Sequence, residues 1–148
     1  MNSNQYPNKK LLTLRDSVPV LPSHYYSQDI KKTRILIVDD DETVREYLRG
    51  LLTMHGYEVA DAWFSKQALD LARELMPSVV LLDIDLAGEC GFDLCRKLRL
   101  MMNGSTVRIL MLTGLLEKHY ETASYNCGAD AVLTKPIDAN NVIAAIGA

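Results

Sequence analysis

The chain has 148 residues, of which 48% are apolar and 24% charged, with a formal net charge of −3. This length and balance are typical of one globular domain with a hydrophobic core. No apolar run approaches the roughly 20 residues of a membrane span, and residues 1–10 lack the apolar core of a signal peptide. We therefore expect a cytoplasmic protein that does not contact a membrane.

The charged residues and the cysteines exclude two further classes of function. Residues 1–33 carry five basic and two acidic side chains, so the rest of the chain is more acidic than the whole. An acidic domain is a poor match for a phosphate backbone, and we expect it to bind no nucleic acid. Cys90, Cys95 and Cys127 fit no zinc-binding spacing and are expected to be free thiols.

Residues 1–33 show no sustained hydrophobic period, and Pro7, Pro19 and Pro22 interrupt them. This pattern predicts a flexible N-terminal leader, followed by a single domain over residues 34–148. A second interpretation stays open, because the apolar residues between positions 11 and 21 would suit a docking segment.

From residue 34 onward, short apolar runs alternate with amphipathic segments. The runs predict strands over residues 34–38, 57–62, 78–82, 107–112 and 131–133. The segments between them predict helices over residues 42–55, 65–75, 91–102, 117–126 and 138–146. Such alternation is typical of a parallel sheet with helices on both faces. The expected fold class is α/β: a flavodoxin-like, doubly wound, five-stranded parallel sheet of order 2-1-3-4-5 with five helices.

The sequence also predicts which side chains cap these helices and which face inward or outward. Asp41 or Thr43 should cap the first helix and Asp138 the last, because short polar side chains bond the free N–H groups of a helix start. Ser65 should open the second helix, and Glu89 should be a solvated side chain. The predicted inward face of the first helix comprises Val44, Tyr47, Leu48, Leu51 and Leu52. The predicted outward face of the third helix comprises Arg96, Lys97 and Arg99.

Polar residues stand at the ends of four predicted strands. They are Asp39 and Asp40 after the first, Asp83 after the third, Thr113 after the fourth and Lys135 after the fifth. Because these strands are neighbours in the predicted sheet, we expect the five side chains to meet at one crevice.

The chemistry of this cluster is constrained by its charge. Two carboxylates about 4 Å apart repel by roughly 4 kcal/mol at an effective dielectric constant of about 20, so three of them must share protons or hold a cation. Oxygen ligands alone suit Mg²⁺, and a lysine with a hydroxyl would balance a phosphoryl group. Carboxylates act as nucleophiles in forming aspartyl phosphates. The cluster therefore predicts phosphoryl transfer to a carboxylate.

Four segments at these strand ends resemble the signature segments of the response regulator receiver domain, as found in chemotaxis regulators. They are ILIVDDDE, VVLLDID, LMLTG and GADAVLTKP, in this order from about residue 34 to the C-terminus. The resemblance implies two-component or phosphorelay signalling with Mg²⁺ as cofactor. It implies a histidine kinase or histidine phosphotransfer protein as the donor. It also implies a regulatory phosphoacceptor, not an enzyme, that assists its own phosphotransfer and autodephosphorylation.

Three roles at the phosphoryl group follow from the resemblance, position by position. Asp83 matches the phosphoacceptor, and Thr113 matches the hydroxyl residue that moves toward the phosphoryl group. Lys135 matches the lysine that pairs with this group, and the resemblance implies a cis peptide bond between Lys135 and Pro136.

The resemblance also implies a set of metal ligands. Asp39 and Asp40 match the acidic pair, with Asp40 ligating the metal directly and Asp39 acting mostly through water. Asp83 and the backbone carbonyl of Asp85 match the remaining protein ligands.

The sequence departs from the family pattern at four positions. Val132 stands where receivers usually carry Tyr or Phe, and Ala87 where Pro is common. Gly114 replaces a common Ala, and Ile137 a frequent aromatic residue. These departures leave the phosphorylation site intact, but they put in question how phosphorylation is read out on the face of the fourth helix, fifth strand and fifth helix.

We therefore expect a phosphoacceptor response regulator that signals through a changed interaction surface. Its output would pass to an unknown downstream protein, through residues 1–33, or through a domain outside this chain, and a homodimer through the fourth and fifth helices stays open. One alternative is a phosphorylation-independent receiver that acts as a protein-docking module, which Val132 and Gly114 favour. Another is a haloacid-dehalogenase-like phosphatase, because LLDIDLAG resembles the DxD motif of that family, although here it lies on the third predicted strand.

Overall fold

The structure is a computed structural model that describes residues 32–103, 106–114 and 118–148. The chain divides into Met1–Lys31 and Lys32–Ala148, and all described residues belong to the second unit. The expectations for the leader over residues 1–33 therefore lie outside the described residues, apart from its last two positions.

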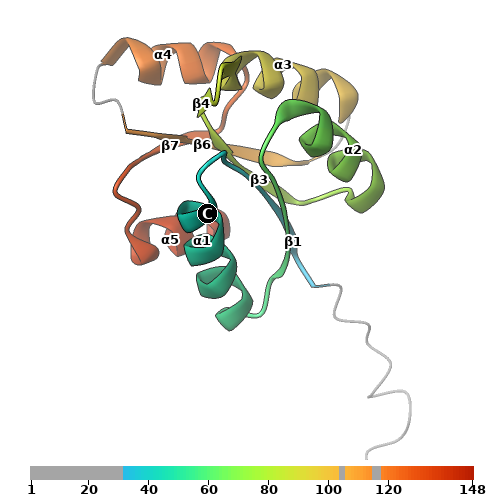
Figure 1. The fold of residues 1–148 in the computed structure, drawn as a ribbon, viewed down its shortest axis with the longest axis vertical. Coiled ribbons are helices and arrows are strands. Elements are labelled where there is room, and N and C mark those ends of the chain that lie inside the picture. Colours follow the sequence, from blue (N-terminus) through green and yellow to red (C-terminus); the bar gives the residue numbers. More distant parts are fainter. Residues whose placement is uncertain (1–31, 104–105, 115–117) are drawn as a thin grey trace, which may run out of the picture. The chain divides into compact units, whose positions relative to one another are not determined.

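Five parallel strands form the central sheet (Figure 1). They are β1 (Arg34–Val38), β2 (Glu58–Ala62), β3 (Val79–Asp83), β6 (Arg108–Thr113) and β7 (Ala131–Thr134). Their order is β2-β1-β3-β6-β7, which confirms the predicted order 2-1-3-4-5 when the strands of this sheet are counted along the chain. All five residues of the central strand β3 are buried, which accounts for its nearly continuous apolar run.

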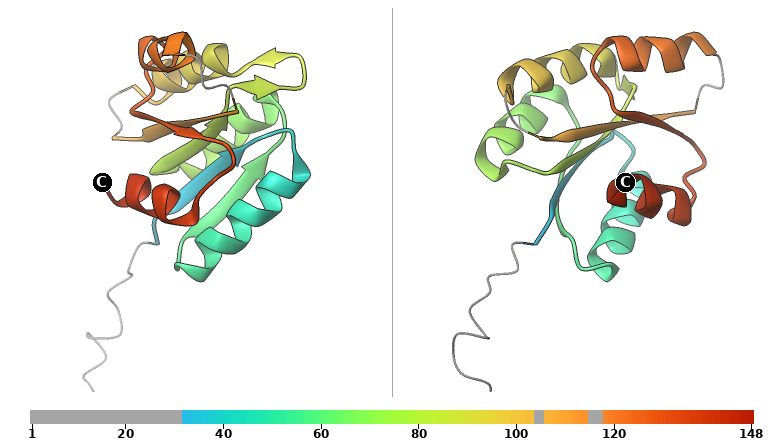
Figure 2. Two further views of the ribbon diagram at one scale, coloured as in Figure 1. Left: turned by 90° about the vertical axis from the view of Figure 1, so that its left-hand side faces the viewer. Right: turned by 180° about the vertical axis from the view of Figure 1, so that it is seen from behind.

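Helices cover both faces of this sheet (Figure 2). They are α1 (Glu42–Met54), α2 (Ser65–Leu75), α3 (Gly91–Met101), α4 (Lys118–Asn126) and α5 (Ala139–Gly147). Along β3, Val79 and Leu81 join the core cluster under α1 and α5, whereas Val80 and Leu82 join the cluster under α2 and α3. The alternation of strand side chains thus builds two cores, and the expected doubly wound α/β fold is confirmed. Within the described residues, no helix combines the length and apolar character needed to cross a bilayer.

Two of the predicted helix caps are present. The carboxylate of Asp41 accepts a hydrogen bond of 2.9 Å from the backbone N–H of Thr43 at the start of α1. Asp138 does the same for α5, with 3.0 Å to the N–H of Asn141. Both helices therefore start where the short acidic side chains predict.

The start of α2 is capped from a distant part of the chain. Its N-cap residue, Phe64, supplies no side-chain hydrogen bond. Instead the carboxylate of Glu89 accepts a hydrogen bond of 2.7 Å from the backbone N–H of Ser65, and this bond lowers the pKa of Glu89. The prediction that Glu89 is merely solvated was wrong, because this exposed side chain ties the loop after β3 to α2.

That loop contains a small hairpin that the sequence did not predict. Strands β4 (Asp85–Leu86) and β5 (Glu89–Cys90) pair antiparallel around a turn at Ala87 and Gly88, whose φ angles are 47° and 90°. Positive φ at both central residues is typical of a type I′ hairpin turn. Proline, whose φ is fixed near −65°, could not adopt the conformation of Ala87, so this turn differs in kind from one with proline at that position.

Two predicted side-chain directions were wrong. Tyr47, placed on the inward face of α1, is 47% exposed, whereas Arg45 on the same helix is buried. Arg99, placed on the outward face of α3, is partly buried and donates hydrogen bonds to the carbonyls of Val107 and Gly128. In each of these helices an arginine side chain turns inward, because backbone carbonyls lie within reach of its guanidinium group.

Gly91 gives a first testable prediction. It begins α3 beside the end of β3, where a Cβ atom would lie 2.3 Å from the carbonyl oxygen of Asp83. Gly91→Ala should therefore lower the free energy of unfolding by about 1–3 kcal/mol, as overpacking does.

Gly50→Ala is the matched control, because Gly50 lies within α1 with nothing within 4 Å of its added Cβ. It should raise stability by about 0.5–1 kcal/mol. Urea unfolding measures both, and a Gly91→Ala protein as stable as wild type would contradict the close approach.

Candidate functional site

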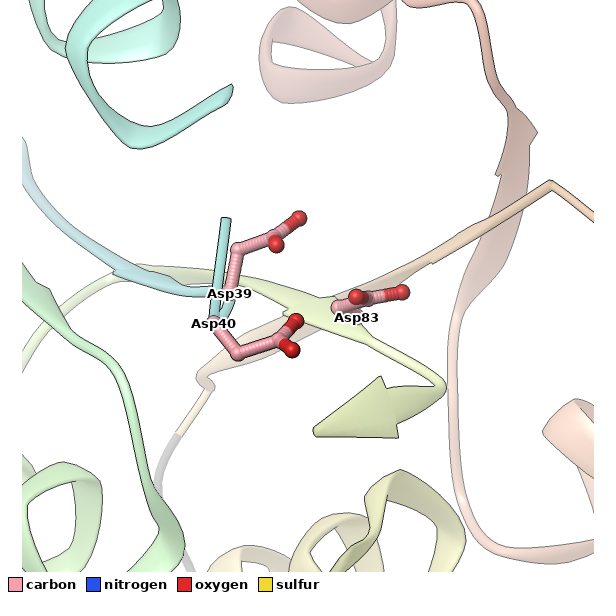
Figure 3. Close-up of side chains that lie close together, drawn as sticks. All are labelled: Asp39, Asp40 and Asp83. Atoms are coloured by element: carbon pink, nitrogen blue, oxygen red, sulfur yellow. The ribbon is translucent and has the colours of Figure 1, made fainter. Parts of the chain in front are cut away.

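The carboxyl ends of four neighbouring strands meet along one edge of the sheet. Asp39 and Asp40 follow β1, Asp83 ends β3, Thr113 ends β6 and Lys135 follows β7. One carboxylate oxygen from each of the three aspartates lies within 4.8 Å of those of the other two. Figure 3 shows the Asp40 carboxylate pointing from the end of β1 toward Asp83. The parallel sheet thus brings together residues that are up to 96 positions apart in the chain.

The three carboxylates differ in their access to solvent. Asp39 is fully buried and Asp83 is 6% exposed, whereas Asp40 is exposed. One oxygen of Asp39 accepts a hydrogen bond of 2.9 Å from the N–H of Asp41, and the other accepts one of 2.7 Å from Nζ of Lys135. Both oxygens of Asp39 are therefore already engaged by the protein, and Asp40 is the carboxylate most accessible to a ligand.

Lys135 lies between two of the aspartates. Its Nζ is 2.7 Å from Oδ2 of Asp39 and 3.3 Å from Oδ2 of Asp83. The peptide bond to Pro136 is cis, as the resemblance implied. The backbone N–H of Lys135 donates a hydrogen bond of 2.7 Å to the carbonyl of Thr113, which fastens the residue after β7 to the end of β6.

The pKa values of this group reflect its burial and its charges. Burial raises the pKa of Asp83 from 3.8 to about 6, and the neighbouring Asp39 adds to this rise, while Lys135 opposes it. Burial alone would lower the pKa of Lys135, but its hydrogen bond to Asp39 and the charge of Asp83 raise it overall. Lys135 therefore stays protonated at neutral pH, whereas Asp83 takes up a proton at a higher pH than an ordinary aspartic acid does.

The donor set fits a hard divalent cation. The cluster of Asp39, Asp40 and Asp83 offers only carboxylate oxygens, and the one lysine between them leaves the group with a surplus of negative charge. Mg²⁺ prefers oxygen ligands and binds through a few carboxylates while keeping several waters. A cation at this edge would relieve the repulsion that raises the pKa of Asp83.

Asp85 and Thr113 flank the cluster. The side chain of Asp85 is exposed, and its backbone N–H faces Oδ1 of Asp83 at 3.4 Å. Thr113 is only 3% exposed, and Gly114 directly after it is exposed. The structure thus places both residues beside the acidic cluster, with Thr113 at the end of a buried strand and Asp85 at the start of the hairpin.

An apolar cavity of about 360 Å³ opens next to Lys135. Its walls are the side of α1 and the segment after β7, and its lining residues are Thr43, Val44, Tyr47, Lys135, Pro136 and Ile137. The exposure of Tyr47 that the sequence failed to predict therefore contributes to a concave surface beside the acidic cluster.

Sequence reasoning missed Arg45 and Asp61. Arg45 donates a hydrogen bond of 2.8 Å to the backbone carbonyl of Asp39 and forms an ion pair of 3.1 Å with Asp61. Asp61 is the residue before the last in β2. Its position near the end of a strand was the sequence signal that could have identified it as part of the site. No sequence signal marked Arg45, since a charged residue in a helix is most often solvated.

Comparison with known proteins identifies the family. A family model described as the response regulator receiver domain matches residues 35–147. The DNA-binding response regulator MtrA of Mycolicibacterium smegmatis is 38% identical over 120 residues, which are 81% of this chain and 51% of MtrA. The chain spans about half the length of the curated relatives that it matches.

Two solved structures extend the likeness to three dimensions. A putative response regulator from Chloroflexus aurantiacus shares 32% identity with a TM-score of 0.71, covering 78% of this chain and 94% of that one. A response regulator protein from Burkholderia pseudomallei, solved with a phosphorylated aspartic acid, calcium ion and citrate, shares 29% identity with a TM-score of 0.72, covering 78% and 66%. Because the family match covers all five strands of the sheet, apart from the first residue of β1, together with its acidic edge, this chain belongs to the response regulator receiver domain family.

Proposed function

We propose that this protein accepts a phosphoryl group from phosphohistidine onto Asp83 and signals through a changed interaction surface. The observation that carries this proposal is the meeting of Asp39, Asp40 and Asp83 within 4.8 Å, with Nζ of Lys135 bound to two of them. Receiver domains act as regulatory phosphoacceptors, and the Burkholderia pseudomallei relative was solved with a phosphorylated aspartic acid. A two-component system or a phosphorelay is the setting in which such a protein operates.

Asp83 is the nucleophile in the proposed step. One of its carboxylate oxygens forms the new O–P bond while the N–P bond of the phosphohistidine breaks, and the electron pair of that bond stays on the imidazole nitrogen of the donor. Asp83 suits this role because it ends a fully buried central strand, so that its carboxylate would be held in place for in-line attack. Its pKa of about 6 leaves it ionised, and hence nucleophilic, at neutral pH.

The residues around Asp83 bind the cofactor and balance the new charge. Mg²⁺, when bound, supplies neutralising charge for the phosphoryl oxygens. Asp40 and Asp83 would hold it directly, Asp39 mostly through water, and the backbone carbonyl of Asp85 would complete the set. The engagement of both Asp39 oxygens by Asp41 and Lys135 supports this division between Asp39 and Asp40.

Lys135 and Thr113 would respond to the phosphoryl group. Lys135 already touches Asp83, so its ammonium can pair with a phosphoryl oxygen after a small movement. Thr113 would move its hydroxyl toward the same group, and the exposed Gly114 beside it adds backbone freedom. Val132 is partly buried, and its side chain is smaller than the aromatic residue that receivers usually carry at this position. It would therefore change how the movement of Thr113 is transmitted to the surface.

The proposed partners follow from the site and from the relatives. A histidine kinase or histidine phosphotransfer protein would supply the phosphoryl group in the cytoplasm, and the apolar cavity beside Lys135 would receive its apolar side chains. The relative MtrA is a DNA-binding response regulator, and the part that aligns with this chain is about half of it. Output from the present domain would pass to a downstream protein or through a homodimer on the α4–α5 face, with no direct contact to nucleic acid.

Phosphoryl uptake from a small donor tests the proposal. Incubation of the full chain with acetyl phosphate and Mg²⁺ should give one phosphoryl adduct in the intact mass, as the P–O bond to acetate breaks and the bond to Asp83 forms. Chelation of the metal with EDTA should reduce the adduct by at least about tenfold, because the carboxylates then repel the incoming phosphoryl group. An adduct that forms equally well in EDTA would contradict the metal site.

The docking module without phosphorylation is the second candidate, and Val132 and Gly114 are the observations that favour it. It predicts no adduct although calorimetry detects Mg²⁺ binding, and equal partner affinity before and after treatment with the donor. A single metal-dependent adduct would exclude it as the whole function.

A further inference from the structure

We propose that Arg45 is a positioning residue for the acidic pair, which holds the backbone between Asp39 and Asp40 so that Asp40 faces the metal site. This inference rests on the proposed function, because it concerns the same Mg²⁺ site. It adds a residue on α1 that touches neither the metal nor the phosphoryl group.

Three contacts hold the guanidinium of Arg45 in place. It is 9% exposed, and its Nη1 donates a hydrogen bond of 2.8 Å to the backbone carbonyl of Asp39. Its Nε donates one of 3.1 Å to the carboxylate of Asp61 at the end of β2. Its central carbon lies 5.8 Å from the ring centroid of Trp63, within reach of a cation–π contact. The side chain therefore cannot swing away without losing a partly buried ion pair.

The carbonyl that Arg45 binds controls the direction of Asp40. This oxygen belongs to the peptide plane that joins Asp39 to Asp40, and a peptide plane turns as one rigid unit. The N–H of Asp39 is fixed separately by the carbonyl of Ala62 on β2, at 3.1 Å. With both sides of Asp39 anchored, the backbone that leads into Asp40 is held in place, and Figure 3 shows the Asp40 carboxylate aimed at Asp83.

Loss of Arg45 would leave the Asp39 carbonyl without this donor. Asp39 is fully buried, so water does not readily replace the guanidinium there. The peptide plane would turn to find another donor, and Asp40 would turn with it. Partners of this kind behind metal ligands change metal affinity by about 10–100-fold when they are removed.

The charge of Arg45 has the opposite effect on Mg²⁺ affinity. The sign of the affinity change on removing Arg45 therefore distinguishes positioning from charge repulsion. A guanidinium beside the carboxylates repels a cation, so a purely electrostatic role predicts tighter Mg²⁺ binding when Arg45 is removed. Asp61 pairs with this charge and reduces its field at the site. We therefore expect positioning to outweigh repulsion, and removal of Arg45 to weaken binding.

Isothermal titration of Mg²⁺ into the full chain tests this. Arg45→Met should raise the Mg²⁺ dissociation constant by about tenfold or more relative to wild type. Arg49→Met is the matched control, because Arg49 on the same helix also pairs with Asp61 but is half exposed. The control should stay within about twofold of wild type, because exposed charges are largely screened.

Two further variants keep the test decisive if Arg45→Met fails to fold. Arg45→Lys keeps the charge but cannot direct two bonds from one planar fork, and it should also weaken Mg²⁺ binding. Asp61→Asn loosens Arg45 from the other side and should weaken binding less than Arg45→Met does. Urea unfolding of each variant, without metal, verifies that the titrated protein is folded.

The outcomes separate the two levels of the proposal. Wild-type protein that binds no Mg²⁺ would overturn the proposed function itself. Wild-type protein that binds Mg²⁺, with folded Arg45 variants that bind it equally or more tightly, would overturn the positioning role alone. Arg45 variants that bind Mg²⁺ more weakly, but still reach full phosphoryl uptake at saturating Mg²⁺, would support the positioning role. A change confined to Mg²⁺ affinity shows that Arg45 acts through the metal ligands.

Discussion

Replacing Asp83 with asparagine is expected to abolish the phosphoryl adduct that acetyl phosphate and Mg²⁺ should produce in the wild-type protein. The amide has no carboxylate oxygen with which to attack phosphorus, while its size and shape preserve the end of β3. Of the nearby carboxylates, Asp39 is fully buried with both oxygens bound, and Asp40 is the proposed direct metal ligand, so neither is expected to substitute as nucleophile. Intact-mass measurement should therefore show complete loss of the adduct.

Asp85→Asn is the matched control for this experiment. It makes the same chemical change two positions away, on an exposed side chain, and leaves in place the backbone carbonyl proposed as a metal ligand. Phosphoryl uptake should stay within about threefold of wild type, because only an exposed and screened charge is lost. An adduct that persists in Asp83→Asn, or disappears equally in both variants, would contradict Asp83 as the acceptor.

The strands and the edge where they converge could be predicted from the sequence. The run from residue 78 to 82 is apolar and ends at a carboxylate, and β3 lies at the centre of the sheet with Asp83 at its carboxyl end. Short buried strands leave a strong signal because both faces of a parallel sheet demand apolar side chains. Once the strand order is known, the meeting of Asp39, Asp83 and Lys135 follows from the geometry of parallel strands.

The contacts that hold this edge in place could not be predicted in the same way. The inward turn of Arg45 depends on a free carbonyl at Asp39, and the cap that Glu89 forms depends on the hairpin after β3. Glu89 and Ser65 lie 24 positions apart, so no local pattern records their pairing, and the bond from Arg45 goes to a backbone carbonyl, which no side-chain pattern marks. The hairpin itself has strands of two residues, too short to show an alternation of polar and apolar side chains.

The second large effect is expected from Lys135→Met in the metal-free protein. The substitution removes the cation between Asp39 and Asp83 but keeps most of the side-chain volume. At pH 7.5 it should lower the free energy of unfolding by about 2–4 kcal/mol, somewhat less than for a fully buried pair because Lys135 is partly exposed. Urea unfolding in EDTA measures this change.

The size of this loss should depend on pH in a defined direction. The pKa of Asp83 in the folded protein, about 6, lies above its ordinary value of 3.8, so ionisation of Asp83 destabilises the fold. This destabilisation is absent below about pH 4, grows between about pH 4 and 6, and is complete above that. Without Lys135 it becomes larger, because the charge and hydrogen bond of Lys135, which lower the pKa of Asp83, are then lost. The difference between variant and wild type should therefore shrink as the pH falls from 7.5 toward 4.5.

Lys66→Met distinguishes this charge effect from the general loss of a lysine. Lys66 forms an ion pair with Asp70 on the exposed side of α2, and its side chain is 81% exposed. Its replacement should change stability by less than about 0.5 kcal/mol at either pH, as is usual for surface pairs.

If Lys135→Met loses the same stability at pH 4.5 and 7.5, the lysine stabilises the fold by packing and not by its charge. If the loss shrinks with pH and added Mg²⁺ restores part of it at pH 7.5, the acidic edge is a site whose surplus charge a cation relieves. The same surplus charge then makes the site unstable when empty and able to bind the metal that the proposed phosphoryl transfer needs.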